Sequence, residues 1–250
     1  MKPIIFAALM LICLSAQSQQ KKVKFFDFET AIVEYTYEGN ETGKQIMYID
    51  EYGWKRAEWT NTTTKVFGQT TEKKQIMVNI GLDIWQWDPI ARTGTRMHNQ
   101  ILENLLKDPQ FDPEKYAKET MESLGFQKTG SEIVQGKNCE VWKGMGSTIW
   151  IWQGLGIKTE VKLLGQKTTW TATKIDLNAR IPQDKFAIPS DIKFGETQTN
   201  DPMEIWMKAL QEQGTENDST ESEDKAGNKE NSNEPPVNMK ELRNLLKKSR

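Results

Sequence analysis

Residues 31–50 read AIVEYTYEGNETGKQIMYID, and this stretch decides the fold class. Ala31, Val33, Tyr35 and Tyr37 recur at every second position, with Glu34 and Thr36 between them, a period of two that is typical of a strand with one buried face. Met47 and Ile49 continue the alternation, and the glycine and asparagine residues at positions 39–43 favour a turn between the two runs. The stretch therefore predicts an antiparallel β-hairpin.

Similar short strands follow this hairpin along most of the chain. We expect them at residues 54–60, 65–69, 75–80, 84–87, 132–134, 138–143, 148–153, 157–164 and 167–178. Turn residues separate them, including the runs at 61–63 and 71–73 and the pair Asp88-Pro89. Ten or eleven strands are too many for a flat sheet in one layer, so we expect strong curvature or closure.

Two helices are expected to interrupt the strands. Apolar residues recur at helical spacing in the first, which ends at Asp108-Pro109: these are Met97, Ile101, Leu102, Leu105 and Leu106. The second begins with Asp112 as N-cap and Pro113 in its first turn, and it ends at Gly125. The sequence thus predicts an α+β fold that is mainly β, a strongly curved antiparallel half-barrel of about eleven strands with a helical lid.

The two ends of the chain have a different composition. Residues 1–18 combine Lys2, an apolar run and Ala16-Gln17-Ser18, as in a secretory signal peptide, so we expect a periplasmic protein, with an extracellular location as the alternative. Residues 19–198 are assigned to the half-barrel domain and residues 199–211 to a short helix. Residues 212–236 have eight acidic residues, two lysines and no large apolar side chain, which predicts a disordered linker.

Residues 237–250 regain periodicity and are expected to form a basic amphipathic helix. Leu242 and Leu246 share one face, and five of the residues around them are basic. An isolated helix of this length is marginal in water, so it needs a partner. Its own domain, an anionic membrane surface and a second protein are the three candidates, and a solvated, frayed end is the alternative.

Several classes of function are excluded or disfavoured by composition. The net charge of −2 leaves the body of the chain close to neutral, which argues against nucleic-acid binding. His98 is the only histidine and Cys139 the only cysteine after the leader, so metal sites and triads that need two of either are excluded. We expect no catalytic site, no metal and no cofactor, and hence no enzyme.

Nine tryptophans are the unusual feature of the composition. Trp85 and Trp87 share one face of a strand, as do Trp150 and Trp152. These aromatics either fill the core or line a concave apolar pocket. For the pocket, the predicted ligand-binding residues are the four tryptophans and three lid residues: Trp85, Trp87, Trp150, Trp152, Ile101, Leu105 and Tyr116.

Several segments of the second half carry a family resemblance. They are residues 136–142 (GKNCEVW), 149–154 (IWIWQG), 157–160 (IKTE) and 175–178, followed by Ile181-Pro182, Phe186, Ile188-Pro189 and residues 192–194. With the strand order and the two-helix insertion, they resemble the LolA/LolB-like periplasmic lipoprotein carrier superfamily over most of residues 23–195. The resemblance implies a half-barrel with a helical lid and an apolar cavity that carries acyl chains, whereas the tail is no part of the family pattern.

Two functions follow as expectations. The first is a non-enzymatic periplasmic protein that binds or carries an apolar ligand, such as a lipid or a lipoprotein acyl chain, in a Trp-rich concave cavity. The alternative is a periplasmic or secreted interaction module with a self-filled core that acts through its C-terminal tail.

Overall fold

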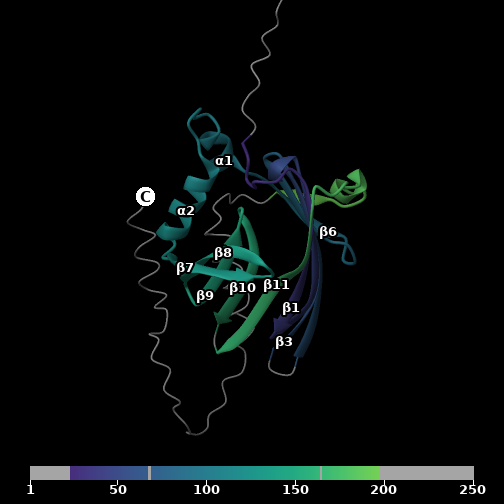
Figure 1. Cartoon of the computed structure of the whole chain (residues 1–250). Coiled ribbons are helices and arrows are strands. Elements are labelled where there is room, and N and C mark those ends of the chain that lie inside the picture. The colour runs from purple at the N-terminus through teal and green to yellow at the C-terminus, as the bar shows by residue number, and fades with distance from the viewer. Residues whose placement is uncertain (1–22, 67–68, 164, 197–250) are drawn as a thin grey trace, which may run out of the picture.

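One open, curved sheet of twelve strands makes up most of the computed structural model, which describes residues 23–66, 69–163 and 165–196 (Figure 1). The strands are β1 Ala31–Gly39, β2 Glu41–Asp50, β3 Lys55–Val66, β4 Gln69–Ile80, β5 Asp83–Asp88, β6 Thr93–His98, β7 Gln127–Val134, β8 Lys137–Gly144, β9 Ser147–Trp152, β10 Leu155–Leu163, β11 Gln166–Leu177 and β12 Phe194–Glu196. The predicted fold class, mainly β with a strongly curved antiparallel sheet, is confirmed.

The sheet order is β12-β6-β5-β4-β3-β2-β1-β11-β10-β9-β8-β7. Within β1 to β6 and within β7 to β11, strands that are neighbours in sequence pair antiparallel as hairpins, and β1 joins the two groups by pairing with β11. β12 is the exception, since it lies parallel to β6. Within the described ranges β7 and β12 are the two edges, so the sheet does not close into a barrel.

The described chain has two α-helices, α1 Gln100–Leu105 and α2 Pro113–Ser123, between β6 and β7. The predicted start of α2 is confirmed, because the Asp112 side chain accepts hydrogen bonds from the backbone N–H groups of Glu114 and Lys115. The helices lie to one side of the sheet, and the 3-10 turns η1 Glu51–Gly53 and η2 Gln183–Phe186 lie near its upper end in Figure 1. Neither helix has the length and apolar character needed to span a membrane, as far as the described residues go.

The predicted start of the first helix is wrong. Met97 and His98 belong to strand β6, where they pair with Ile84 and Asp83 of β5. Helix α1 begins only after Asn99, whose side chain accepts a hydrogen bond from the backbone N–H of Leu102 at 2.9 Å. Pairing with β5 therefore outweighs the helical spacing of Met97 with the leucines that follow it.

The predicted turns at residues 61–63 and 71–73 are also wrong. These residues pair with each other in the middle of two twelve-residue strands, with Thr62 opposite Lys73 and Thr63 opposite Glu72. Threonine is β-branched and suits a strand, and here it outweighs the turn preference of the single asparagine, Asn61. The three pieces predicted over residues 54–80 are thus two strands, while β6 and β12 are additional to the prediction.

The regular register from β1 to β6 defines two faces. The cavity face carries Tyr35, Met47, Glu58, Met77 and Gln86. The last four are direct cross-strand partners from β2 to β5, and Tyr35 of β1 lies one pair further along the strands. The covered face carries the alternate residues: Ile32, Tyr48, Ala57, Val78 and Trp85.

A separate hydrophobic core lies on each side. On the covered face, residues after β11 pack over the sheet: Ile181, Phe186 and Ile192 are buried with Ala57, Val78 and Trp87. The second core joins β1 to the other half of the sheet and includes Val33, Tyr35, Cys139, Trp150 and Ile157, with Phe26 and Phe28 from the segment before β1.

The predictions for the ends fall outside the described residues. They are the signal peptide at 1–18, the short helix at 199–211, the linker at 212–236 and the terminal helix at 237–250.

Candidate functional site

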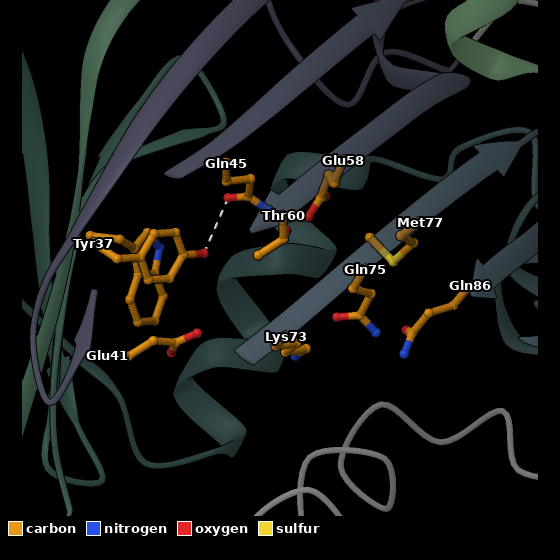
Figure 2. Close-up of a pocket in the computed structure, with 10 residues that line it drawn as sticks. Tyr37, Glu41, Gln45, Glu58, Thr60, Lys73, Gln75, Met77 and Gln86 are labelled. Carbon is orange, nitrogen blue, oxygen red and sulfur yellow. Dashed lines mark hydrogen bonds between the residues drawn. The ribbon is translucent and has the colours of Figure 1, made fainter. Parts of the chain in front are cut away.

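A cavity of about 220 Å³ opens on the cavity face of the sheet (Figure 2). Its lining comes from six adjacent strands, β11, β1, β2, β3, β4 and β5: Tyr37, Glu41, Gln45, Glu58, Thr60, Lys73, Gln75, Met77, Gln86 and Trp170. Because one cavity extends over six neighbouring strands, this face is the concave side of the curved sheet. In Figure 2 Tyr37 and Glu41 stand at one end and Gln86 at the other.

A glycine stands opposite Tyr37 on the neighbouring strand. Gly43 of β2 is the direct cross-strand partner of Tyr37 on β1 and of Thr62 on β3. A Cβ atom at Gly43 would stand 2.3 Å from the carbonyl oxygen of Asn61, and its φ of 145° is one that other residues rarely adopt. The close approach of the β3 backbone therefore requires glycine at this position, directly beside Tyr37.

A chain of polar contacts crosses the floor of the cavity. The Tyr37 hydroxyl donates to Oε1 of Gln45 at 3.3 Å, and Nε2 of Gln45 donates to Oε2 of Glu58 at 2.9 Å. Nε of Arg56 lies 3.1 Å from the other carboxylate oxygen of Glu58. Both ends of the Gln45 amide are therefore satisfied, which fixes its orientation although the side chain is buried.

Tyr37 acts as a hydrogen-bond donor here at neutral pH. Burial raises the pKa of its hydroxyl well above the ordinary value, and the nearby carboxylates of Glu41 and Glu58 raise it further. The hydroxyl stays protonated, so it keeps its bond to Gln45 and keeps its own oxygen lone pairs available to accept.

An aromatic pair closes one end of the cavity. Tyr37 on β1 and Trp170 on β11 are direct cross-strand partners, and their rings stack with centroids 5.6 Å apart and planes 18° apart. Such pairs are rigid apolar surfaces. Here the pair stands next to a lining that is otherwise polar, apart from Met77.

Five polar lining residues make no side-chain hydrogen bond or ion pair to any other described residue. They are Glu41, Thr60, Lys73, Gln75 and Gln86. Together they offer a carboxylate, a hydroxyl, an ammonium group and two amides to whatever enters the cavity.

The structure divides the seven predicted ligand-binding residues among three places. Trp85 and Trp87 lie on the covered face, with Trp87 only 6% exposed and packed edge-on against Phe194 at 6.0 Å between centroids. The two tryptophans therefore share one face of β5, as strand parity predicts, but this face is the one opposite the cavity.

Trp150 and Trp152 belong to the second core. Trp150 donates its indole N–H to Oε2 of Glu132 at 2.7 Å, and Lys158 lies over its ring at 4.4 Å. Trp152 stacks on Phe28 at 6.3 Å, with Lys137 over its ring at 4.3 Å. Other side chains of the protein thus occupy the surroundings of both indoles.

The three predicted lid residues are on the helices and outside the cavity lining. Ile101 on α1 and Tyr116 on α2 are 36% and 37% exposed, and Leu105 is half-buried. Tyr116 contacts Phe111 at 5.8 Å. Contact of these seven residues with a ligand stays a prediction.

The two residues considered for nucleophilic chemistry lie far apart in the fold. Cys139 is buried in β8, where burial raises the pKa of its thiol and so disfavours the reactive thiolate. His98 stands at the end of β6 between the carboxylates of Asp83 and Glu103. Within the described ranges, no group of three or more His, Cys, Asp or Glu residues is placed to hold a metal ion.

The predicted pocket rests on two pairs of tryptophans and the helices, and none of the ten residues that line the cavity belongs to the predicted set. Three of them, Thr60, Lys73 and Gln75, lie in or beside the segments that were predicted as turns. The available signal was the period of two: Gln45 and Met47 continue the face of Val33 and Tyr35 toward Glu58 and Thr60. Polar residues on a face that is apolar further along the strands indicate that the apolar core ends there.

Comparison with known proteins gives partial structural likenesses. No protein-family model and no curated protein matches the sequence. An uncharacterised conserved protein from Thermus thermophilus matches with a TM-score of 0.41 and 8% identity, over 72% of this chain and 94% of that one. The Pseudomonas aeruginosa MucA/MucB complex matches with a TM-score of 0.35 and 15% identity, over 66% of this chain and 58% of that one.

A putative outer membrane lipoprotein-sorting protein domain from Vibrio parahaemolyticus matches with a TM-score of 0.24 and 12% identity, over 63% of this chain and 89% of that one. Since each TM-score is below 0.5, these likenesses assign neither a family nor a function to this chain.

Proposed function

We propose that this chain is a non-enzymatic binding protein of the periplasm, and that its ligand enters the cavity on the concave face and carries several hydrogen-bonding groups. The observation that supports the proposal is the lining, in which eight of ten residues have polar side chains and five of these lack a partner among the described residues. An apolar ligand in this place would leave those groups desolvated and unpaired, at about 1–3 kcal/mol each.

The arrangement of Glu58 supports binding rather than catalysis. Each of its two carboxylate oxygens already has a partner, Gln45 on one side and Arg56 on the other. A carboxylate held between an amide and a guanidinium group in this way orients its neighbours, which suits a binding site. We therefore expect the protein to bind and release its ligand without changing it chemically.

Two adjacent lysines give a matched test of the cavity. Lys73 lines the cavity and Lys74, the next residue of β4, points to the other face. Polar metabolites co-purified from the periplasm would be identified by native mass spectrometry, and their affinity measured by calorimetry. We expect Lys73→Ala and Gln86→Ala to weaken binding about tenfold, and Lys74→Ala to leave it unchanged. Equal affinity in all four proteins would contradict the proposal.

An apolar ligand on the helices is a second candidate, and the exposure of Ile101 and Tyr116 favours it. An acyl chain laid across these side chains and Leu105 would remove apolar surface from water. Titration with a lysophospholipid, followed by tryptophan fluorescence, tests this candidate. Ile101→Ser should weaken binding, while Lys73→Ala should have no effect. The opposite pattern would place the lipid in the cavity.

The location and the C-terminal tail are also proposals. Cell fractionation tests export, which rests on the composition of residues 1–18. Membrane contact through residues 237–250 is tested by co-sedimentation with anionic vesicles, comparing the full chain with a version that ends at Pro236. The membrane proposal requires that only the full chain sediments at low salt and that salt releases it.

A further inference from the structure

The first clue to the class of ligand is the position of the aromatic pair. Tyr37 and Trp170 form a rigid stack at one end of the cavity, and both rings belong to its lining. Polar groups surround the pair on neighbouring strands, so a ligand that contacts it also meets hydrogen-bonding groups. A suitable ligand has a flat C–H surface on one side and hydroxyl or amide groups around its rim.

The second clue is a polar row across three strands. Gln45 on β2, Thr60 on β3 and Gln75 on β4 are direct cross-strand partners. The Cβ atoms of such partners are about 4.5–5.5 Å apart, so two or three of these side chains reach a ligand of the size of one sugar ring. Amides and hydroxyls both donate and accept, and this matches hydroxyl groups, which do the same.

The third clue is charge. Two carboxylates, Glu41 and Glu58, line the cavity, and Lys73 is the single cation in the lining. Arg56 lies beside Glu58 and is already paired with it. This balance disfavours phosphate, sulfate and other anionic ligands, which need unpaired cations.

The fourth clue is size. The cavity of about 220 Å³ is smaller than the roughly 300–1,000 Å³ of sites that enclose a drug-sized ligand. It therefore has room for one ring, with the remainder of a longer molecule outside. A second hollow of about 330 Å³ shares Lys73, Gln75 and Gln86 with the cavity and reaches residues 93–95 of β6, so a longer ligand can extend there.

From these four observations we infer that the ligand is a neutral carbohydrate, one sugar ring of which lies in the cavity. The ring stacks its C–H face on an outer face of the Tyr37–Trp170 stack, since the inner faces cover each other, and takes hydrogen bonds from Thr60, Gln75 and Gln86. Glu41 and the Tyr37 oxygen accept from its hydroxyl groups. This inference rests on the proposed binding function and names the class of ligand for the same cavity.

The test uses the exported full chain and a broad glycan array, followed by calorimetry with the best neutral oligosaccharide and with its reduced, ring-opened form. We expect binding of the cyclic form, and a loss of at least tenfold for Gln75→Ala and for Gln86→Ala. Both side chains lack partners among the described residues, so these variants should fold normally. Mass spectrometry of the recovered oligosaccharide should show that it is intact.

Two tryptophans provide the matched control for stacking. Trp170→Ala should abolish binding, whereas Trp59→Ala, on the covered face and 37% exposed, should not. Should Trp170→Ala fail to fold, the indole N–H signal of Trp170 in the wild-type ¹H–¹⁵N spectrum replaces it: the oligosaccharide should shift this signal and leave that of Trp59 in place.

The possible failures are distinguishable. If no glycan binds while a cationic peptide or another polar compound shifts the cavity signals, the carbohydrate inference is wrong and the proposed binding function stands. If neither glycans nor other polar compounds shift those signals, both are wrong. Hydrolysis of the oligosaccharide would retain the ligand class and overturn the non-enzymatic function.

Discussion

Trp87 and Phe194 meet edge to face on the covered side of the sheet, with ring centroids 6.0 Å apart. Trp87 comes from β5 and Phe194 from β12, the short parallel strand beside β6. Between them lies Gly94 of β6, the direct partner of both. The segment after β11 is thus attached to the sheet through an aromatic contact over a glycine.

This contact predicts a large loss of stability for Trp87→Ala. The side chain is 6% exposed and packs among Ile181, Phe186 and Ile192, so its removal leaves a cavity in the core. We expect the free energy of unfolding to fall by about 3–5 kcal/mol, measured by urea denaturation. Ile90→Ala is the control, because Ile90 is 68% exposed and should change stability by less than about 0.5 kcal/mol. A similar small effect at both positions would contradict the packing described.

Replacing Gly94 should destabilise the fold for purely steric reasons. A Cβ atom there would stand 2.8 Å from the carbonyl oxygen of Gln86 and 2.8 Å from the Phe194 ring. Gly94→Ala should therefore cost about 1–3 kcal/mol of unfolding free energy, because either the ring or the strand has to move. Gly156→Ala is the matched control, since no atom lies within 4 Å of a Cβ at that strand position. Thermal denaturation compares the two, and equal melting temperatures would refute the steric explanation.

Replacing Thr62 with valine should increase the stability of the fold. It is 1% exposed, and its hydroxyl oxygen has no hydrogen-bond partner among the described residues. Thr62→Val removes that group and keeps the branched shape, so we expect about 1 kcal/mol more unfolding free energy, measured by urea denaturation. Thr60→Val, at a partly exposed position, should gain less. A loss of stability in Thr62→Val would mean that the hydroxyl has a partner that the protein atoms do not supply.

The curved antiparallel sheet could be predicted from sequence because its signals are local. Alternation from Ala31 to Tyr37, the Asp112 cap and the turns around single glycines all act within a few residues, and the structure retains each of them. The strand count was nearly correct for the same reason. Two strands were missed for different reasons. β12 depends on a distant partner, because it exists only where Phe194 can lie beside Gly94. β6 pairs locally with β5, but Met97 at its end also matches the helical spacing of the residues that follow.

The cavity could not be predicted in the same way. Its lining alternates along six strands, and it becomes one surface only after β1 pairs with β11, more than 130 residues away in the sequence. The tryptophans were a poorer guide, because an apolar residue on a strand is explained equally well by a core and by a pocket. Register decides between them: Trp87 is opposite Ile76 on the covered face, and Trp170 is opposite Tyr37 on the cavity face.

His98 predicts a pH-dependent attachment of helix α1 to the sheet. Nδ1 lies 3.1 Å from Oδ1 of Asp83 on β5, and Nε2 lies 3.3 Å from Oε2 of Glu103 on α1. Both ring nitrogens thus face carboxylate acceptors, so both should carry a proton. Hydrogen bonds to Asp83 and Glu103 accordingly raise the pKa of His98 above its ordinary value of 6.5.

The sign of the effect follows from the raised pKa. The stabilisation is fully present below the unfolded value of 6.5, and it is lost as the pH rises through the higher pKa of the folded protein. Arg96 also pairs with Asp83 at 3.1 Å, so Asp83 keeps a cationic partner when His98 is neutral, whereas Glu103 loses the imidazolium. We therefore expect the α1 end of the contact to weaken first.

An NMR titration of the His98 ring protons measures the pKa directly, and amide hydrogen exchange across residues 99–106 measures the attachment of the helix. Protection corrected for intrinsic exchange should fall above the folded pKa in the wild type and show no such step in His98→Gln. In Glu103→Gln the pKa of His98 should move back toward 6.5, because one of its two carboxylate partners is neutralised. A His98 pKa at or below 6.5 in the wild type would contradict the bridge, as would an unchanged pKa in Glu103→Gln.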